Sequence, residues 1–98
     1  MVEVRWTLQA IEDLEAITAF IATDSPDYAS LFAMNVFAAV ERLAEFPRSG
    51  KRLMELSDQS VREILFGSYR IIYRINPDLV EILTVFHGAR LLNPSNLE

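Results

Sequence analysis

Side chains that can bind anions or transfer protons gather in the last third of this 98-residue chain. An arginine guanidinium binds a phosphate or a carboxylate through two hydrogen bonds, and a histidine titrates close to neutral pH. Such a set could grip or cleave a phosphate group, or it could hold a partner protein. Its members are Arg62, Tyr69, Arg70, Tyr73, Arg74, His87 and Arg90, and His87 is the only histidine in the chain.

Turn residues predict that this segment folds as a three-stranded antiparallel meander. Gly67-Ser68 separates the first two strand-like runs, and Asn76-Pro77-Asp78 separates the second two. Glycine, asparagine, aspartate, serine and proline are the residues that most often form turns between strands. Because the meander folds residues 61–90 back on themselves, we expect the arginines, tyrosines and histidine to converge in space.

Two arginines lie on the middle strand-like run, and two interpretations of them are open. Side chains alternate between the faces of a strand, so Arg70 and Arg74 share one face while Tyr69 and Tyr73 share the other. Solvent-facing arginines on a half-buried strand are common. The functional alternative is a clamp for a phosphate or a carboxylate, which Arg62 of the adjacent strand could join.

The histidine stands at the end of the last apolar run. A histidine in such a place more often makes a structural hydrogen bond, so His87 is a candidate for proton transfer only if it faces the arginines. Gly88 follows it. We expect a positive φ at this glycine, which would turn Arg90 back toward the sheet.

The first quarter of the chain predicts a strand and a helix. Residues 2–6 alternate with a period of two, and Thr7 is a typical cap for a helix that runs to about Ala22. An apolar stripe at helical spacing gives this helix a core-facing side. Its acidic residues are expected to form a solvated surface, and they are Glu12, Asp13 and Glu15.

A second helix is predicted between two prolines. Ser25 can cap it, Pro26 suits its first position, and it runs to about Glu45 before Pro47 stops it. Its core stripe is Phe32, Val36, Ala39 and Leu43, whereas Met34, Phe37 and Val40 lie off that stripe.

The order of these elements predicts an α+β fold. It consists of an N-terminal strand and a helical hairpin packed on one face of a mostly antiparallel four-stranded sheet. A polar connector, residues 47–60, joins the helices to the meander. Residues 1–98 form a single domain, and the tail 91–98 is given no function because Leu97-Glu98 could derive from an expression vector.

Composition narrows the class of function. The chain has no cysteine and one histidine, so we expect no disulfide, no metal site and no cofactor. No apolar stretch reaches the ~20 residues that span a bilayer, and the start lacks a signal-peptide pattern, so a cytoplasmic location is expected. The net charge of −5 argues against a general nucleic-acid binder. Residues 1–47 carry −6 and residues 48–98 carry +1, so a local anion site in the second half stays possible.

Short motifs along nearly the whole chain resemble the RelE/ParE family of toxins from bacterial toxin–antitoxin operons, also called plasmid-stabilisation proteins. Each motif is weak alone, but their order and spacing together are specific. The family fold, a helical hairpin on a small antiparallel sheet, agrees with the predicted element order. The matching residues are Trp6-Thr7, Ala10, Asp13-Leu14, Ile17, Ile21-Ala22, Ser25-Pro26, Phe46-Pro47, Gly50, Val61-Arg62-Glu63, 69–74 and 85–90.

The resemblance implies one of two activities. RelE-like members are ribosome-dependent mRNA interferases, and in one branch Arg70 and His87 would match the catalytic arginine and histidine, with Arg74 also holding the phosphate. That branch has a tyrosine where this chain has Gly88, and the nearest glutamate, Glu55, is displaced from the expected place. ParE-like members lack the catalytic set and poison DNA gyrase by binding it.

The ParE-like interpretation is preferred, because the ending of residues 87–90 is similar to that branch and the chain is acidic. The expected partners are a cognate antitoxin and DNA gyrase, with the ribosome in the interferase alternative and a homodimer as a further expectation. A third alternative is an inactive relative that retains only antitoxin binding. The candidate partner-binding residues are Arg62, Tyr69, Arg70, Arg74, His87 and Arg90.

Overall fold

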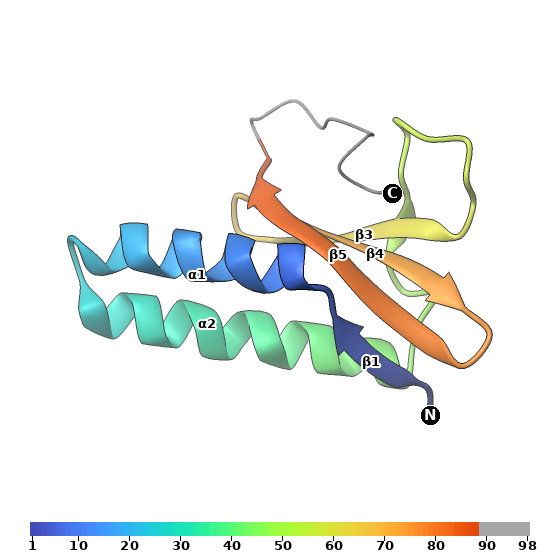
Figure 1. Cartoon of the computed structure of the whole chain (residues 1–98), viewed down its shortest axis with the longest axis horizontal. Helices are drawn as coiled ribbons and strands as arrows, with labels where there is room; N and C mark the ends of the chain where they lie inside the picture. Colours follow the sequence, from blue (N-terminus) through green and yellow to red (C-terminus); the bar gives the residue numbers. More distant parts are fainter. Residues whose placement is uncertain (89–98) are drawn as a thin grey trace.

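The computed structural model describes residues 1–88, and Arg90 and the tail lie outside this range. The elements in chain order are β1 (Glu3–Trp6), α1 (Leu8–Ala22), α2 (Pro26–Glu41), the 3₁₀ turn η1 (Arg42–Ala44), β2 (Lys51–Arg52), β3 (Val61–Phe66), β4 (Tyr69–Asn76) and β5 (Leu79–His87). The two helices lie side by side as a hairpin, and the meander follows them (Figure 1).

One five-stranded sheet carries the fold, in the order β1-β5-β4-β3-β2. β1 pairs with β5 in parallel, and the other neighbours are antiparallel. The α+β class is therefore confirmed, but the predicted count of four strands was one short. The additional strand, β2, has only two residues, Lys51 and Arg52, so no alternation within the connector could indicate it.

Caps and turns define the element ends much as the sequence predicts. The Thr7 side chain accepts a hydrogen bond from the Ala10 N–H, and the Ser25 side chain accepts one from Tyr28. Gly67 has φ +57° in the β3–β4 turn, a conformation that glycine adopts without strain. The predicted positive φ at Gly88 is wrong: its N–H donates to the Ser68 carbonyl, which closes the end of the sheet without a left-handed residue.

The second helix is shorter than predicted. It ends at Glu41, and η1 tightens the chain into a 3₁₀ turn well before Pro47. Val40 is fully buried and belongs to the core stripe, because it lies four residues after Val36, whereas Ala39 is only half-buried. The stripe on α2 is therefore Phe32, Val36 and Val40, continued by Leu43 in η1.

The sheet has a hydrophobic cluster on each face. The helix-facing cluster joins α1 and α2 to Ile71 and Tyr73 of β4 and to β5. The opposite face, called here the far face, has a smaller cluster formed by Leu53, Val61, Ile72, Leu83 and Phe86. A register shift between Ile72 and Tyr73 leaves Leu83 of β5 without a partner on β4, and this bulge accompanies the change of face along β5.

Candidate functional site

The sequence-predicted site residues do not converge, because the sheet separates them. Arg70 and Arg74 lie on the far face, as alternation predicted: Arg70 pairs in register with Phe86, and its guanidinium lies 5.1 Å from the centroid of that ring. Tyr69 and His87 pair with each other on the helix-facing side, with ring centroids 5.4 Å apart. Tyr69 also contacts Phe32 of α2, at 5.1 Å between centroids, which fixes its face.

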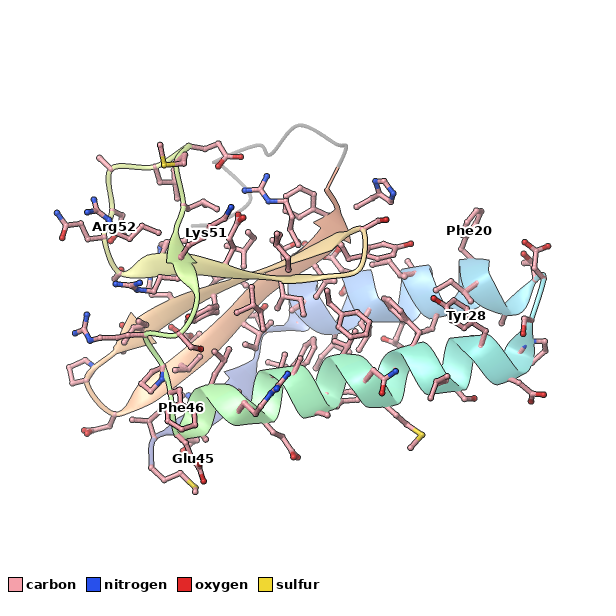
Figure 2. The ribbon with its side chains drawn as sticks, turned by 180° about the vertical axis from the view of Figure 1, so that it is seen from behind. Phe20, Tyr28, Glu45, Phe46, Lys51 and Arg52 are labelled. Atoms are coloured by element: carbon pink, nitrogen blue, oxygen red, sulfur yellow. The ribbon has the colours of Figure 1, made fainter. Side chains whose placement is uncertain are left out.

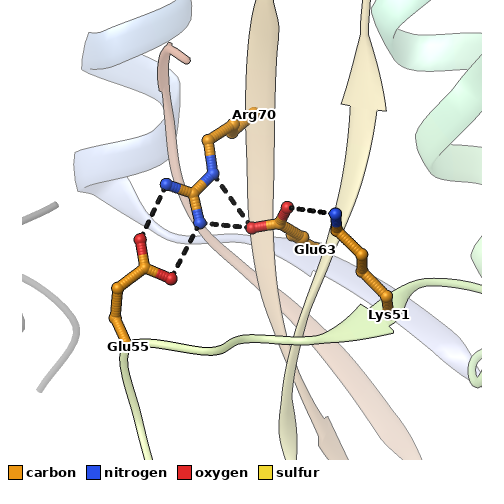
Figure 3. Close-up of polar contacts among 4 residues, drawn as sticks. All are labelled: Lys51, Glu55, Glu63 and Arg70. Carbon is orange, nitrogen blue, oxygen red and sulfur yellow. Dashed lines mark hydrogen bonds and ion pairs between the residues drawn. The ribbon is translucent and has the colours of Figure 1, made fainter. Parts of the chain in front are cut away.

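Carboxylates enclose the guanidinium of Arg70 (Figure 3). Its Nη1 and Nη2 donate to the two Glu55 oxygens at 2.9 and 3.1 Å. Its Nε donates to Glu63 Oε2 at 2.9 Å, and its Nη2 donates to the same oxygen. Lys51 Nζ lies 3.7 Å from the other oxygen of Glu63. The donors that would grip a phosphate are thus already used within the protein.

Electrostatics strengthen this closed network. The hydrogen bond from Arg70 is the main reason that the pKa of Glu55 lies below its usual value, so this carboxylate is charged at neutral pH. The same bond with Glu55, helped by Glu63, raises the pKa of Arg70 above that of a free arginine. Only 14% of the Arg70 side chain is exposed. These groups act as a structural ion-pair cluster that fastens the connector to β4.

Arg74 lies further along the same face and is less enclosed. Its Nη2 is 3.8 Å from Asp58 Oδ2, and 29% of its side chain is exposed. The side chain and backbone N–H of Ser60 both donate to Asp58 Oδ1, and these bonds lower the pKa of Asp58. The connector therefore covers Arg74 as well, through a second carboxylate.

A hollow of about 500 Å³ lies beside His87 on the helix-facing side. Its wall includes Tyr69, Val85 and the α1 residues Asp13 and Phe20. His87 is exposed here and contributes to a partly apolar surface. The position of His87 is therefore suited to contact with a partner, and it lies across the sheet from Arg70 and Arg74.

The prediction that Asp13 belongs to a solvated acidic face is wrong. Its Oδ2 accepts hydrogen bonds from the Thr84 hydroxyl and, at 3.3 Å, from the Val85 N–H, while Oδ1 accepts from Gln9 at 2.8 Å. A carboxylate that accepts a backbone N–H across elements is a structural anchor. Asp13 joins α1 to β5 at the point where the sheet bulges.

Arg62 also departs from the expected cluster. It pairs in register with Tyr73, so it points to the helix-facing side, and its Nη1 donates to the Gly50 carbonyl at 2.8 Å. The buried Tyr73 hydroxyl accepts from the Gly50 N–H at 2.9 Å and donates to the Pro47 carbonyl at 2.8 Å. A Cβ at Gly50 would lie 2.5 Å from the Glu63 carbonyl oxygen and 2.5 Å from the Tyr73 hydroxyl, so only glycine fits.

Sequence reasoning missed Glu63, which is central to the far face. Only the β3–β4 register, which places Glu63 opposite Ile72 and beside Arg70, brings this carboxylate to the guanidinium. A usable signal existed in the alternation of Val61, Glu63 and Leu65 combined with the two-residue turn at Gly67-Ser68, because that turn sets the register that puts Glu63 on the face of Arg70. Glu55 has no such signal, because its place depends on the path of the connector.

The comparisons with known proteins agree with this architecture. The model of the ParE toxin of type II toxin–antitoxin systems matches residues 4–92. The chain belongs to the ParE toxin family. A Sinorhizobium fredii protein with the provisional toxin designation Y4kP is 43% identical over 89 residues, covering 87% of this chain and 86% of the relative. Toxin RelE2 of Caulobacter vibrioides is 36% identical over 92 residues, covering 93% and 100%.

Two solved structures share the fold. A chain of the chromosomal ParDE system of Pseudomonas aeruginosa matches with a TM-score of 0.74 over 89% of this toxin and 96% of that chain, and its 21% identity supports the fold alone. A chain of the RelBE2 toxin–antitoxin complex of Mycobacterium tuberculosis matches with a TM-score of 0.60 at 30% identity, over 92% and 97%. The protein is thus a type II toxin of the ParE/RelE superfamily. Among residues 1–88, no helix has the length and apolar character needed to cross a membrane.

Proposed function

We propose that this toxin acts by binding DNA gyrase, not by cleaving RNA, and that a cognate antitoxin neutralises it. The observation that carries the proposal is the arrangement of the candidate catalytic residues. Arg70 is held between Glu55 and Glu63 on the far face, and His87 lies on the helix-facing side.

RNA cleavage needs three groups around one phosphate. A base must activate the 2′-hydroxyl, cations must stabilise the phosphate, and an acid must protonate the leaving oxygen. Here the guanidinium of Arg70 is already neutralised, and the sheet separates it from His87. Gly88 supplies no phenol at the following position. These features favour a toxin whose effect comes from contact with its target.

The interferase remains the second candidate, because the chain is 36% identical to a relative named toxin RelE2 along that relative's whole length. In this alternative Arg70 and Arg74 would hold the phosphate and His87 would move the proton. The connector would first have to release Arg70 from Glu55. No such step is needed for a binding toxin.

The helical hairpin offers a surface for an antitoxin. Large apolar side chains are exposed along it: Phe20 (73% exposed), Tyr28, Leu31 and Met34. Figure 2 shows Phe20 and Tyr28 at the outer end of the hairpin. A free toxin must cover such a surface, and an extended, partly disordered antitoxin segment that folds along the helices and a sheet edge would do so.

Expression in bacterial cells tests the proposal. We expect filamentation and DNA damage, rescued by co-expression of an antitoxin, and we expect His87→Ala to leave toxicity largely unchanged. Rapid arrest of translation that disappears with His87→Ala, in a variant that keeps its fold, would favour the interferase. Arg70→Ala is a poor probe, because it leaves the 5%-exposed Glu63 without its main partner and would destabilise the fold.

A further inference from the structure

Arg52 and Arg62 lie opposite each other at the edge of the sheet, and Arg48 stands two residues before Gly50 in the adjoining connector. Arg52 of β2 lies directly opposite Arg62 of β3 in the antiparallel register. Arg48 lies between Pro47 and Gly50, and these two residues are fixed by hydrogen bonds to Tyr73 and Arg62. Figure 2 shows Arg52 extending from the sheet edge, away from the helices.

Like charges directly opposite on neighbouring strands repel each other, so this pair costs stability unless something balances it. Four other cations in the described range have a carboxylate within 4 Å, whereas Arg42 has none: Arg5 has Glu3, Lys51 and Arg70 have Glu63, and Arg74 has Asp58. Within residues 1–88, neither Arg48 nor Arg52 has such an ion pair. Glu63 is adjacent in sequence to Arg62 but points to the far face.

Arg62 is held by a hydrogen bond to the backbone and has one unsatisfied donor. Its Nε is buried and has no hydrogen-bond partner within the described residues, while its Nη1 is fixed on the Gly50 carbonyl. An unsatisfied buried donor on a charged group is costly, and natural structures rarely retain one without a reason. The guanidinium is thus held in one orientation with part of its donor capacity unused.

We propose that Arg48, Arg52 and Arg62 form a binding site for phosphate groups of a nucleic-acid backbone, and that duplex DNA is the source. Guanidinium groups bind phosphate bidentately, and a backbone presents repeated phosphates that suit several arginines from separate segments. The choice of DNA rests on the proposed function, because gyrase holds duplex DNA. The site would anchor the toxin on the complex of enzyme and DNA.

Acidic composition does not argue against a site of this size. The net charge of −5 arises in the first half of the chain, and residues 48–98 carry +1. Figure 2 shows Glu45, the carboxylate that precedes the connector, at the end of the helical layer and well apart from Arg52. The site is local, so we expect modest affinity and a strong dependence on salt.

Fluorescence anisotropy with a short labelled DNA duplex tests the site on the purified toxin. Three phosphate contacts predict a slope of log K against log salt of about −2.7, and Arg52→Gln should reduce it to about −1.8 and weaken binding about tenfold at low salt. The matched control is Arg5→Gln, an exposed arginine on β1 that pairs with Glu3. This control should bind the duplex like the wild type.

Thermal unfolding separates this role from a structural one. Arg52→Gln removes one of two opposed like charges, so its melting temperature should hold or rise while DNA binding falls. Arg62→Gln should also weaken binding, but it disturbs the Gly50 contact, so the exposed Arg52 carries the test. Equal weakening by Arg5→Gln and Arg52→Gln, an unchanged salt slope, or polyglutamate binding in preference to DNA would overturn the phosphate site.

Two further experiments distinguish DNA from RNA as the ligand and test the site independently of the proposed function. Single-stranded RNA bound more tightly than duplex, through the same arginines, would overturn the assignment to DNA. A gyrase supercoiling assay is run in parallel. Arg52-dependent duplex binding without gyrase inhibition would reject the proposed function and keep the site, whereas inhibition unchanged by Arg52→Gln, with no duplex binding, would reject the site alone.

Discussion

The Arg70 guanidinium is bound by two carboxylates of its own chain, Glu55 and Glu63. Protonation at low pH can remove the charge of Glu55. The hydrogen bond from Arg70 holds the pKa of Glu55 below the usual value of a glutamate. A lowered pKa means that Glu55 stabilises the fold above about pH 4.5 and that this contribution is lost as the pH falls through the folded-state value. The connector should therefore loosen from β4 only as the pH falls below about 4.5.

Glu55→Gln tests this pairing. The variant should be less stable than the wild type at pH 7, by no more than about 1 kcal/mol because Glu55 is partly exposed. The difference should hold from pH 6 to about 5 and shrink as the pH falls further toward 3. Urea unfolding at several pH values measures it, and a difference that stays constant over this range would contradict the assigned ion pair.

Tyr73 supports the connector through its hydroxyl, and burial raises the pKa of this phenol so that it remains a donor. Tyr73→Phe would leave the Gly50 N–H and the Pro47 carbonyl without their partner, at a cost of about 1–3 kcal/mol. Tyr28→Phe, at an exposed tyrosine, is the matched control and should change the free energy of unfolding by less than about 0.5 kcal/mol. Similar losses in both variants would contradict the anchoring role.

The alternation of side chains along a strand predicts which residues of β4 share a face, but it does not predict the contacts between strands. It correctly placed Arg70 and Arg74 on one face and Tyr69 on the other. It could not show that His87 belongs with Tyr69, because that depends on the register between β4 and β5. Proximity in sequence therefore predicted one cluster, whereas the sheet separates His87 from Arg70 and Arg74.

Side-chain hydrogen bonds from Thr7 and to Asp13 join the beginning of α1 to β5. The Thr7 hydroxyl donates to the Ile82 carbonyl at 2.7 Å, and Asp13 accepts from Thr84 and Val85. These contacts surround the bulge at Leu83, where the strand has lost a regular partner. The helical layer and the sheet are thus fixed to each other at the irregular point of the sheet.

Asp13→Ala should therefore destabilise the fold. It removes charge-assisted hydrogen bonds to Thr84 and Val85, and we expect a loss of about 2 kcal/mol in the free energy of unfolding. Glu12→Ala changes a neighbouring exposed acid and should change that free energy by less than about 0.5 kcal/mol. Unfolding in guanidinium chloride measures the free energies of the two variants. Equal values would contradict the anchoring role of Asp13.

Long periodic elements were predictable, and short ones were not. Caps at Thr7 and Ser25 and the turn at Gly67 are local signals, so the helix starts and the meander follow from the sequence. β2 has two residues and forms because the connector pairs with β3. η1 has three residues, and its Ala44 carbonyl accepts a hydrogen bond from the Val2 N–H. Both contacts are tertiary, so no local pattern could indicate these elements.

At the scale of the whole molecule, the exposed apolar side chains of the helical hairpin should affect the association state of the toxin in solution. Phe20, Leu31 and Met34 are half or more exposed, which is costly for a free monomer. We expect the isolated toxin to self-associate with rising concentration, and an antitoxin to abolish this. Light scattering measures the mass, and a monomer that persists at high concentration would contradict the expectation.

DNA supercoiling by purified gyrase shows whether the toxin acts by binding this enzyme. A parallel reaction offers the same toxin to translating ribosomes carrying labelled mRNA. We expect wild-type toxin and His87→Ala to inhibit supercoiling equally and to leave the mRNA intact. Cleavage of mRNA by the wild type that His87→Ala abolishes, with supercoiling unaffected, would contradict this expectation.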